Sequence, residues 1–471
     1  MVDFLIQIFR SSYETLYIAT FIVAVFLFIS GLDDLFVDIY YWLHYIFNRR
    51  KFNKFRYERR EKIINLPEKP IAIYIPAWHE HDVIDTMLLN AVKTIQYSNY
   101  DIFVGVYPND PATIRKVEEV SRRHPNVHAV ISDNPGPTTK ANNLNQIHEG
   151  MIKWENKTGK RYEIIVMHDS EDVIHPMSLK VHNALIPEFD MVQLPVFPLH
   201  TDHMNLVHWT YADEFAENHT KDLFARQYFS GFVPSAGVGT AFNRWIIEFI
   251  GSSYAKNIFR TKCLTEDYDL ALRLALGKAN MLFAYKPFGI DCATRGYFPH
   301  TMQAAIRQKS RWITGICLQS WQTIGWRGDA RFKFVLYRDR KAVITNMVNF
   351  LAYIVVIYLM LYELVRLGFS AYRDLPSIVT QNTTLWYLVI IDTLLMIWRM
   401  LHRFISVKRV YGVFAALLSI IRSPVSNIIN FSATSRALYM FAKSLLSKKE
   451  LKWEKTRHHF PAVSVPREWP R

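Results

Sequence analysis

The chain has 471 residues, of which 50% are hydrophobic, 14% are aromatic and 21% are charged. This length exceeds that of one compact domain, and the composition excludes both a disordered chain and a protein built only of membrane spans. The net charge of +14 is densest at residues 49–62, shortly after an apolar stretch, which indicates a membrane surface rather than nucleic acid as the partner. Cys263, Cys292 and Cys317 form neither a disulfide framework nor a CxxC metal pair.

Three apolar stretches have the length and composition of membrane spans. Residues 15–32 are uncharged, residues 342–362 follow the basic segment RDRK, and residues 385–398 precede several basic residues. A bilayer core needs about twenty apolar residues, so we expect three spans. The basic flanks lie on one side, and the positive-inside rule therefore predicts that residues 48–341 and the C-terminal tail are cytoplasmic. The stretch 410–421 is too short to cross, and we expect it to begin helices that lie in the membrane interface.

Residues 70–300 alternate between apolar strands and amphipathic helices. We expect strands at residues 71–77, 101–107, 126–132 and 162–169, with helices between them. This alternation predicts an α/β domain with a mostly parallel, Rossmann-like sheet that is covered on both faces. Such sheets bind ligands beyond the carboxyl ends of their strands, where polar clusters stand in this sequence. Neither GxGxxG nor GxxxxGK[ST] is present, which disfavours a dinucleotide site and a P-loop.

Acidic residues stand at two positions that suit catalysis. Asp169, Glu171 and Asp172 follow an apolar strand, and hard divalent cations take carboxylate oxygens as ligands. An acidic helix N-cap would favour the same residue types, and the two interpretations carry equal weight. Glu266 and Asp267 fall in the first turn of a predicted helix, where capping alone would also explain them.

The segment QKSRW at residues 308–312 lies in a basic helix that also carries aromatic residues. Arg311 can bind phosphate oxygens through its guanidinium fork, and Trp312 can offer a flat ring to a sugar. A helix on the membrane surface with snorkelling cations would show the same pattern, and both interpretations can hold together. Trp209 and Tyr211 are expected to add to a sugar-contacting surface.

The order of these motifs is more specific than any one of them. PAWHE, ND, KANNLN, DSE, TED and QKSRW follow one another between the first span and the later spans. From about residue 68 to 320 the chain resembles the inverting, metal-dependent glycosyltransferase family that includes cellulose, chitin and hyaluronan synthases. The segments at 168–176, 208–223, 237–244 and 453–461 are similar to the glycosyltransferase module of the bacterial phage-adsorption protein B group. Longer members of that group carry a C-terminal cyclic-di-GMP-sensing domain, for which we expect no room in this sequence.

The resemblance implies a GT-A-like fold and a role for each motif residue. The residues implied to bind the nucleotide-sugar are Pro76, Ala77, Glu80, Asp110, Lys140 and Asp169. The implied ligands of Mg²⁺ or Mn²⁺ are Asp169 and Glu171, where the glutamate departs from an Asp-x-Asp pattern and Asp172 could share the metal. The implied catalytic residues are Asp267, as general base, and the neighbouring Glu266. Gln308, Arg311 and Trp312 are implied to bind the pyrophosphate and the acceptor sugar.

These observations predict a multi-pass protein in five parts. The parts are residues 1–66 with the first span and the basic segment, 67–300 with the GT-A domain, 301–341 with QKSRW and interfacial helices, 342–405 with two spans, and 406–471 with interfacial helices and a basic tail. We expect the protein to lie in the bacterial inner membrane with its catalytic domain in the cytoplasm.

The expected reaction is inverting transfer from a UDP-sugar, with UDP-N-acetylhexosamine favoured, to elongate an envelope or exopolysaccharide. Single-sugar transfer to a lipid or lipid-linked acceptor is the alternative, since three spans are few for a glycan channel in one protomer. A non-catalytic component of an envelope complex is a third interpretation. The expected partners are the UDP-sugar donor, a growing glycan or lipid-linked acceptor, membrane lipids, an outer-membrane or envelope export partner and a second copy of the chain, without nucleic acid.

Overall fold

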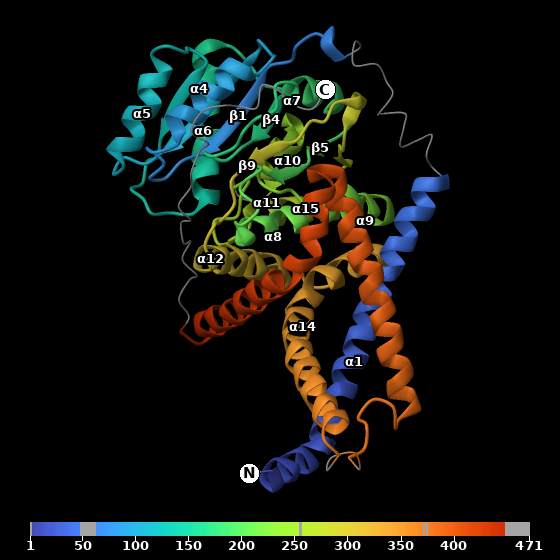
Figure 1. Cartoon of the computed structure of the whole chain (residues 1–471). Helices are drawn as coiled ribbons and strands as arrows, with labels where there is room; N and C mark the ends of the chain where they lie inside the picture. The colour runs from blue at the N-terminus through green and yellow to red at the C-terminus, as the bar shows by residue number, and fades with distance from the viewer. Residues whose placement is uncertain (1, 48–62, 254–256, 371–372, 374, 448–471) are drawn as a thin grey trace.

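The computed structural model of the chain describes residues 2–47, 63–253, 257–370, 373 and 375–447. It consists of an α/β domain and three long helices that extend from it and contact one another (Figure 1). The N-terminus lies at the end of the first long helix that is far from the domain. The basic run predicted at residues 49–62 and the segment 453–461 lie outside the described residues.

A seven-stranded sheet forms the centre of the α/β domain, in the order β3-β2-β1-β4-β7-β5-β8. Strand β7 is antiparallel to both of its neighbours, and the other pairs are parallel. The four predicted strands are confirmed, and so is the mostly parallel sheet. The strands are Ile71–Pro76 (β1), Tyr100–Val106 (β2), Val127–Ile131 (β3), Ile164–Met167 (β4), Met191–Gln193 (β5), Thr240–Asn243 (β7) and Met281–Phe283 (β8).

Apolar residues of the central strands face two separate cores, one on each side of the sheet. Ile71, Ile73 and Ile75 of β1 point into one core, while Ala72 and Tyr74 point into the other. This alternation follows from the two-residue repeat of a strand, and burial on both faces explains why the strands are apolar throughout. The first core is covered by α4 (Ile84–Thr94), α5 (Pro111–Ser121) and α7 (Ser178–Leu185), and the second by α6 (Lys140–Thr158), α10 (Arg244–Ser253) and α11 (Glu266–Leu276).

The remaining elements of the domain connect the sheet to the long helices. A small parallel sheet pairs β6 (Val196–Pro198) with β9 (Thr294–Gly296), and a 3₁₀ turn, η2, spans Pro287–Gly289. Two helices pass through a π-helical segment, which in other proteins often marks a functional site. These continuous runs are α8 (Leu206–Glu217), η1 (Asn218–Asp222) and α9 (Leu223–Ser230), and then α12 (Met302–Ile313), η3 (Thr314–Gln319) and α13 (Ser320–Ile324).

Three helices among the described residues are long and apolar enough to cross a membrane. The three spans predicted from the sequence are therefore confirmed as membrane-spanning candidates. On the first of them Ile18, Ile22 and Ile29 are each more than half exposed, about one or two helical turns apart, as expected of a face that meets lipid. The helices are α1 (Val2–Phe47, with the candidate span at Ser11–Phe47), α14 (Ala330–Gly368) and α15 (Thr383–Ser447).

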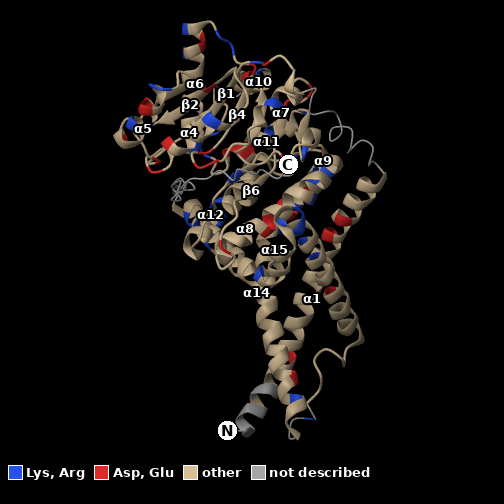
Figure 2. Ribbon diagram, turned by 45° about the horizontal axis from the view of Figure 1, so that its top comes forward, with Lys and Arg blue, Asp and Glu red and all other residues tan. Residues whose placement is uncertain are grey.

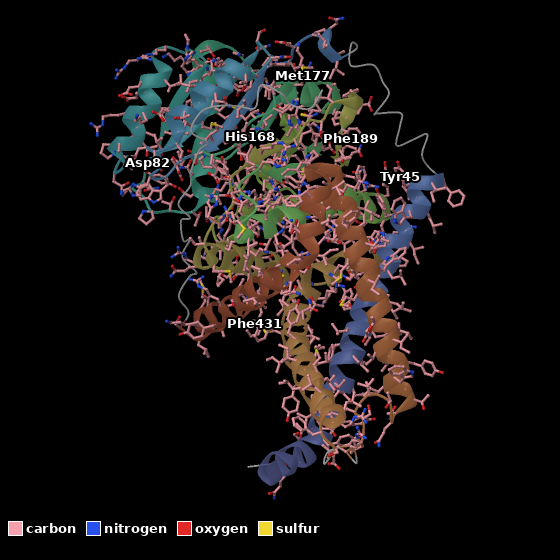
Figure 3. All side chains as sticks on the ribbon, viewed as in Figure 1. Tyr45, Asp82, His168, Met177, Phe189 and Phe431 are labelled. Carbon is pink, nitrogen blue, oxygen red and sulfur yellow. The ribbon has the colours of Figure 1, made fainter. Side chains whose placement is uncertain are left out.

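Helix α15 changes direction at Gly412, whose φ of 87° and ψ of 176° are not helical and are rare for a residue with a Cβ. Beyond this point the helix contacts α8 and α12. Phe431, labelled in Figure 3, stacks on Phe350 of α14 with ring centroids 3.9 Å apart. Phe414 and Ile421 are exposed on another side, so this part of α15 has the amphipathic form expected of an interfacial helix.

Charged side chains are sparse on the parts of the three long helices that lie away from the α/β domain (Figure 2). They collect where these helices meet the domain. There Asp33 and Asp34 of α1 pair with Arg338 and Lys341 of α14. Ion pairs therefore join α1 and α14 at the ends of their apolar segments that lie near the domain. In a membrane protein, water and lipid headgroups are found at this level.

Candidate active site

The predicted catalytic acids stand at the first turn of α11, after Thr265 at the N-cap. A loop that leads into β7 lies directly against them. A Cβ added at Gly237 in this loop would be 2.6 Å from Asp267 Oδ2, and Gly237 has a φ of +73°. A side chain at this position would therefore collide with the carboxylate and strain the backbone, so glycine lets the loop support Asp267.

The helix with QKSRW reaches the same place through a second close contact. A Cβ added at Gly315, in η3, would lie 2.2 Å from Thr265 Oγ1. The backbone N–H of Leu264 also donates to Gln319 Oε1 at 2.9 Å. The start of the TED segment is thus packed against η3, the segment that follows QKSRW.

Lys140 joins the acids of two motifs. It is the first residue of α6, where Thr139 caps the helix by accepting a hydrogen bond from the backbone of Asn142. Its Nζ lies 2.5 Å from Asp169 Oδ1 and 3.8 Å from Glu266 Oε1. Because Asp169 follows β4 and Glu266 begins α11, three segments that are distant in sequence meet at one ammonium group.

Burial and mutual charge shift the pKa values of this cluster. Burial raises the pKa of Glu266 to about 7, with Lys140 acting against the shift and Asp267 adding to it. Burial also raises the pKa of Asp267, although the cations of Lys140 and Arg311 oppose the rise. Burial disfavours the charge on Lys140, but Asp169, Glu266 and Asp267 outweigh it and raise the pKa of the ammonium. The two adjacent acids therefore hold part of a proton near neutral pH.

The loop after β4 is shaped by Asp172. Its Oδ2 accepts a hydrogen bond from the backbone N–H of Asp169 at 3.0 Å and lies 2.9 Å from His168 Nδ1. The side chain is only 7% exposed, and His168 lies inside the α/β domain (Figure 3). Asp172, which was expected to be able to share a metal, is thus directed into the protein and holds the loop.

Asp169 remains partly open, with 31% of its side chain exposed. Across the described parts of the chain, no three His, Cys, Asp or Glu side chains are grouped as metal ligands. Mg²⁺ and Mn²⁺ at nucleotide sites commonly take only one or two carboxylates and complete their shell with phosphate oxygens and water. Asp169 and Glu171 offer hard oxygen donors of this kind, and the ammonium of Lys140 shows that Asp169 accommodates a cation. The residues therefore fit a metal that arrives with a diphosphate.

The loop after β1 is held against the start of α5. Asp110 caps α5, since Oδ1 accepts from the backbone N–H of Thr113 at 3.3 Å and Oδ2 from that of His79 at 2.6 Å. The backbone N–H of Glu80 donates to Thr113 Oγ1. Ala77, Glu80 and Asp110 are at most 6% exposed, so in this structure they support the loop. Pro76 ends β1 and is partly exposed beside it.

The same loop presents an aromatic ring that was not among the predicted site residues. Trp78 packs edge-on against Tyr107, with ring centroids 4.8 Å apart. A Cβ at Gly136 would lie 2.4 Å from the Trp78 ring, and two hydrogen bonds join Gly136 to Asn109. The signal in the sequence was an aromatic residue directly after a buried strand of a parallel sheet, the position where such sheets bind ligands.

The side chains of α12 form the remaining wall. Gln308 Oε1 is buried and has no hydrogen-bond partner within the described ranges, a state that costs about 1–3 kcal/mol and that a ligand hydroxyl would relieve. Trp312 lies edge-on to Tyr211 at 5.9 Å and close to Phe215, so α8 covers part of its ring. Trp209 and Tyr211 are fully buried, so the prediction that they contact a sugar is wrong. Both residues belong to α8, which is packed between two helices. Tyr211 contacts α12, and Trp209 contacts α15.

The mostly parallel sheet, with acidic side chains beyond the ends of its strands, defines an α/β domain of a ligand-binding class. Residues 67–315 match the family model described as glycosyltransferase-like family 2, which is more than half of the chain. The chain belongs to this family. The predicted resemblance to a glycosyltransferase family is therefore confirmed.

Two relatives from Escherichia coli extend the comparison. Bacteriophage adsorption protein B of strain K12 and bacteriophage N4 adsorption protein B of O157:H7 are each 39% identical over 98% of this chain, which confirms the predicted likeness to that group. The chain spans 64% of the length of these relatives. A solved mannosyltransferase from Pyrobaculum calidifontis, in complex with GDP-Man and Mn²⁺, is 14% identical with a TM-score of 0.47, covering 87% of this chain and 99% of its own. That likeness is too low to add to the assignment.

Proposed function

We propose that the chain is a membrane-bound inverting glycosyltransferase that uses a UDP-sugar and a divalent metal. The observation that carries this proposal is the convergence of Lys140, Asp169, Glu266 and Asp267 in a glycosyltransferase domain. Burying several charges together is costly, and such clusters are found where a charged substrate uses them.

The positions of these groups support the following reaction. Asp267 takes the proton of the acceptor hydroxyl while the hydroxyl oxygen attacks the anomeric carbon of the donor. The bond from that carbon to the diphosphate breaks, and UDP leaves with the electron pair. Because the hydroxyl attacks from the face opposite the diphosphate, the configuration of the anomeric carbon is inverted. The cations of Lys140 and Arg311, whose charges act on Asp267, oppose the negative charge that grows on the leaving group.

We assign Asp169 and Glu171 as the residues that hold Mg²⁺ or Mn²⁺ together with the diphosphate. A bound ion of this kind supplies electrostatic stabilisation of the leaving diphosphate. Pro76, Ala77 and Glu80 frame the nucleoside, and Asp110 fixes their loop while the ring of Trp78 stands beside it.

The favoured acceptor is a growing envelope polysaccharide, and the favoured donor is a UDP-N-acetylhexosamine. We assign Gln308 and Trp312 to the acceptor, and the buried Gln308 Oε1, which lacks a hydrogen-bond donor among the described residues, supports this assignment. We place the spans in the bacterial inner membrane and the catalytic domain in the cytoplasm, because Arg338, Lys341 and Arg403 lie where the long helices meet the domain. The name of the relatives refers to bacteriophage adsorption, which takes place at the cell surface and suits an exported glycan.

Single-sugar transfer to a lipid-linked acceptor is the second candidate, because three spans leave little room for a glycan channel within one chain. The decisive experiment incubates the purified full-length protein in lipid nanodiscs with labelled UDP-sugars, Mn²⁺ or Mg²⁺ and extracted bacterial lipids, and then sizes the product. A polymer supports chain elongation, and a one-sugar lipid supports the second candidate. Absence of UDP release with every UDP-sugar would contradict the proposed function.

A further inference from the structure

Helix α14 carries the segment RDRK at the point where it meets the α/β domain. Arg338 and Lys341 pair with α1, while Asp339 contacts α9 and α11. The guanidinium of Arg340 lies over the ring of Trp326, 4.5 Å from its centroid. The RDRK segment, whose basic residues predicted the orientation of the spans, therefore also connects the membrane-spanning helix α14 to the domain.

Asp339 is the residue of this segment that contacts α11, the helix that carries Asp267. The hydroxyl of Tyr268 donates to Asp339 Oδ2 at 2.5 Å, and the guanidinium of Arg226 pairs with both carboxylate oxygens. The thiol of Cys317 donates to the backbone carbonyl of Asp339. Tyr268 is only 4% exposed, and a buried hydrogen bond to a charged acceptor is stronger than one between neutral groups. The contact therefore fixes the Tyr268 side chain to α14.

Tyr268 directly follows Asp267, and its backbone N–H donates to Asp267 Oδ1 at 2.8 Å. One residue thus holds the carboxylate of the base through its backbone and is itself held to α14 through its hydroxyl. We propose that Tyr268 and Asp339 are positioning residues for Asp267, through which the membrane-spanning helix α14 sets the base relative to the donor site. This inference rests on the proposed function, because it requires Asp267 to act as the base.

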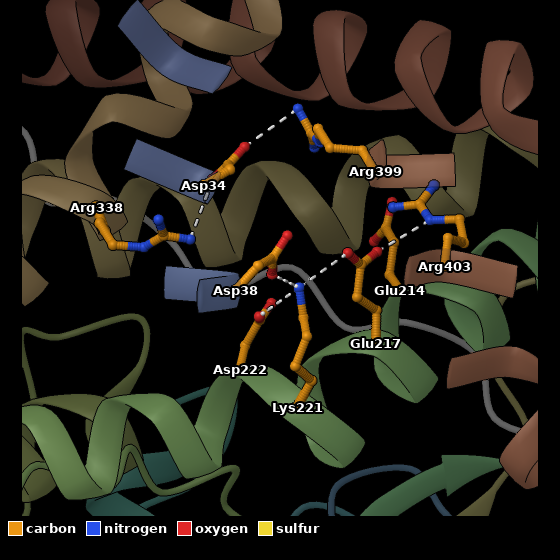
Figure 4. Close-up of a pocket in the computed structure, with 9 residues that line it drawn as sticks. All are labelled: Asp34, Asp38, Glu214, Glu217, Lys221, Asp222, Arg338, Arg399 and Arg403. Atoms are coloured by element: carbon orange, nitrogen blue, oxygen red, sulfur yellow. Dashed lines mark hydrogen bonds and ion pairs between the residues drawn. The ribbon is translucent and has the colours of Figure 1, made fainter. Parts of the chain in front are cut away.

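The contact between α14 and α1 differs from the contact between Asp339 and Tyr268, because it consists of several ion pairs. Asp33 and Asp34 each pair with both Arg338 and Lys341, so these contacts duplicate one another. They lie beside a cavity of about 200 Å³ among α1, α8, η1, α14 and α15 (Figure 4), and ion pairs between these elements join charged residues of its lining. Loss of Arg338 therefore leaves Lys341 to hold α14 to α1. The lining residues are Asp34, Asp38, Glu214, Glu217, Lys221, Asp222, Arg338, Arg399 and Arg403.

The test compares Tyr268→Phe and Asp339→Asn with Arg338→Gln, all in the full-length protein in nanodiscs. Tyr268→Phe removes one oxygen and keeps the pair of Asp339 with Arg226, so folding should be preserved. We expect kcat to fall about tenfold in Tyr268→Phe and up to about 10²-fold in Asp339→Asn, because small displacements of a reacting group cost this much. The KM for the UDP-sugar should stay within about twofold, since Lys140 and Asp169 stand on other elements.

The variant Arg338→Gln is the matched control, because it changes the preceding residue of the same helix without touching Tyr268. It should keep wild-type kcat. The double variant Tyr268→Phe, Asp339→Asn should lose about as much as Asp339→Asn alone, since both changes act on the contact between Tyr268 and Asp339. An equal loss of kcat in Arg338→Gln, or an unchanged kcat in Tyr268→Phe, would overturn the positioning role while leaving the proposed function intact. Wild-type protein that releases no UDP would overturn the proposed function, and the positioning role with it.

Discussion

The donor-facing edge of the sheet and the junction with the membrane-spanning helices are built in opposite ways. At the sheet edge, β1 lies between β2 and β4 and is parallel to both, so the loops that follow these strands begin at the same edge. At the junction, helices α1, α8, α14 and α15 come together through side chains that are far apart in the sequence. Lys309, for example, lies between Glu214 of α8 and Asn430 of α15, at 2.6 to 2.8 Å from their oxygens.

The difference suggests that two regions of the protein have different tasks: the sheet edge carries reacting and binding groups, and the junction holds helices in position. In the proposed function, the sheet edge supplies the groups that face the nucleotide, and the strand order brings these groups to one edge. The junction joins α11 and α12 to the long helices, and it includes ion pairs such as those of Arg226 with Asp339 and of Lys309 with Glu214. Substitutions at the edge should therefore alter catalysis or donor binding, whereas substitutions at the junction should alter stability or the alignment of the base.

The largest expected effect is that of Asp267→Asn, at the point where the two regions meet. The amide cannot accept the proton of the acceptor hydroxyl, so kcat should fall about 10³-fold while UDP binding is retained. Transfer rates and calorimetric UDP affinity measure the two quantities. Glu248→Gln, which changes an acid on the outer side of α10, is the control and should retain full activity. Normal turnover in Asp267→Asn would show that another group is the base.

The junction is tested by Lys309→Met. This change leaves Glu214 without its main cation, and an unpaired buried charge costs about 3 kcal/mol, so the free energy of unfolding should fall by about that amount. Unfolding in mixed micelles measures the change, with the exposed Lys93→Met as control. Adding Glu214→Gln to Lys309→Met should restore part of the loss, because no charge is then left unpaired. A double variant less stable than the single one would mean that Lys309 acts mainly through packing.

The sheet edge is tested by removing the metal or its ligand. Treatment with a chelator, or Asp169→Asn, should weaken donor binding and lower kcat/KM by about tenfold or more, because the diphosphate loses an oxygen-bound cation. Re-addition of Mn²⁺ should restore the chelated wild type but not the variant. The exposed Glu188→Gln serves as the control for loss of one carboxylate. Full activity in the presence of the chelator would remove the metal from the proposal.

The smallest effect is a shift in the pH profile. Asp267 works as a base only when deprotonated, so kcat should fall as the pH drops through its pKa, which burial raises above the ordinary aspartate value. The ammonium of Lys140 lowers this pKa, and Lys140→Met should therefore move the acid limb of kcat, measured at saturating donor, to higher pH. A limb that moves to lower pH would contradict the contact between Lys140 and the acids of α11.

Much of the α/β domain was predictable from the sequence because its signals are local. Each of the first four strands is a short apolar run that ends in polar residues, and this pattern predicted both the sheet and the edge where Asp169 stands. The ordered motifs then predicted which acids meet. The role of Trp78 was missed because a single aromatic residue after a strand resembles an ordinary core residue until its neighbours are known.

The sequence by itself determined the class of the protein and its three membrane-spanning candidates, and it predicted which acids stand at the site, since composition, periodicity and motif order can be read directly along the chain. Only the tertiary structure decided how those acids are held. It buried Trp209 and Tyr211 in the protein, directed Asp172 inward, and joined Tyr268 to Asp339 of a membrane-spanning helix. These contacts depend on which helix faces lie against each other, and long-range packing of this kind leaves no repeat or spacing in the sequence.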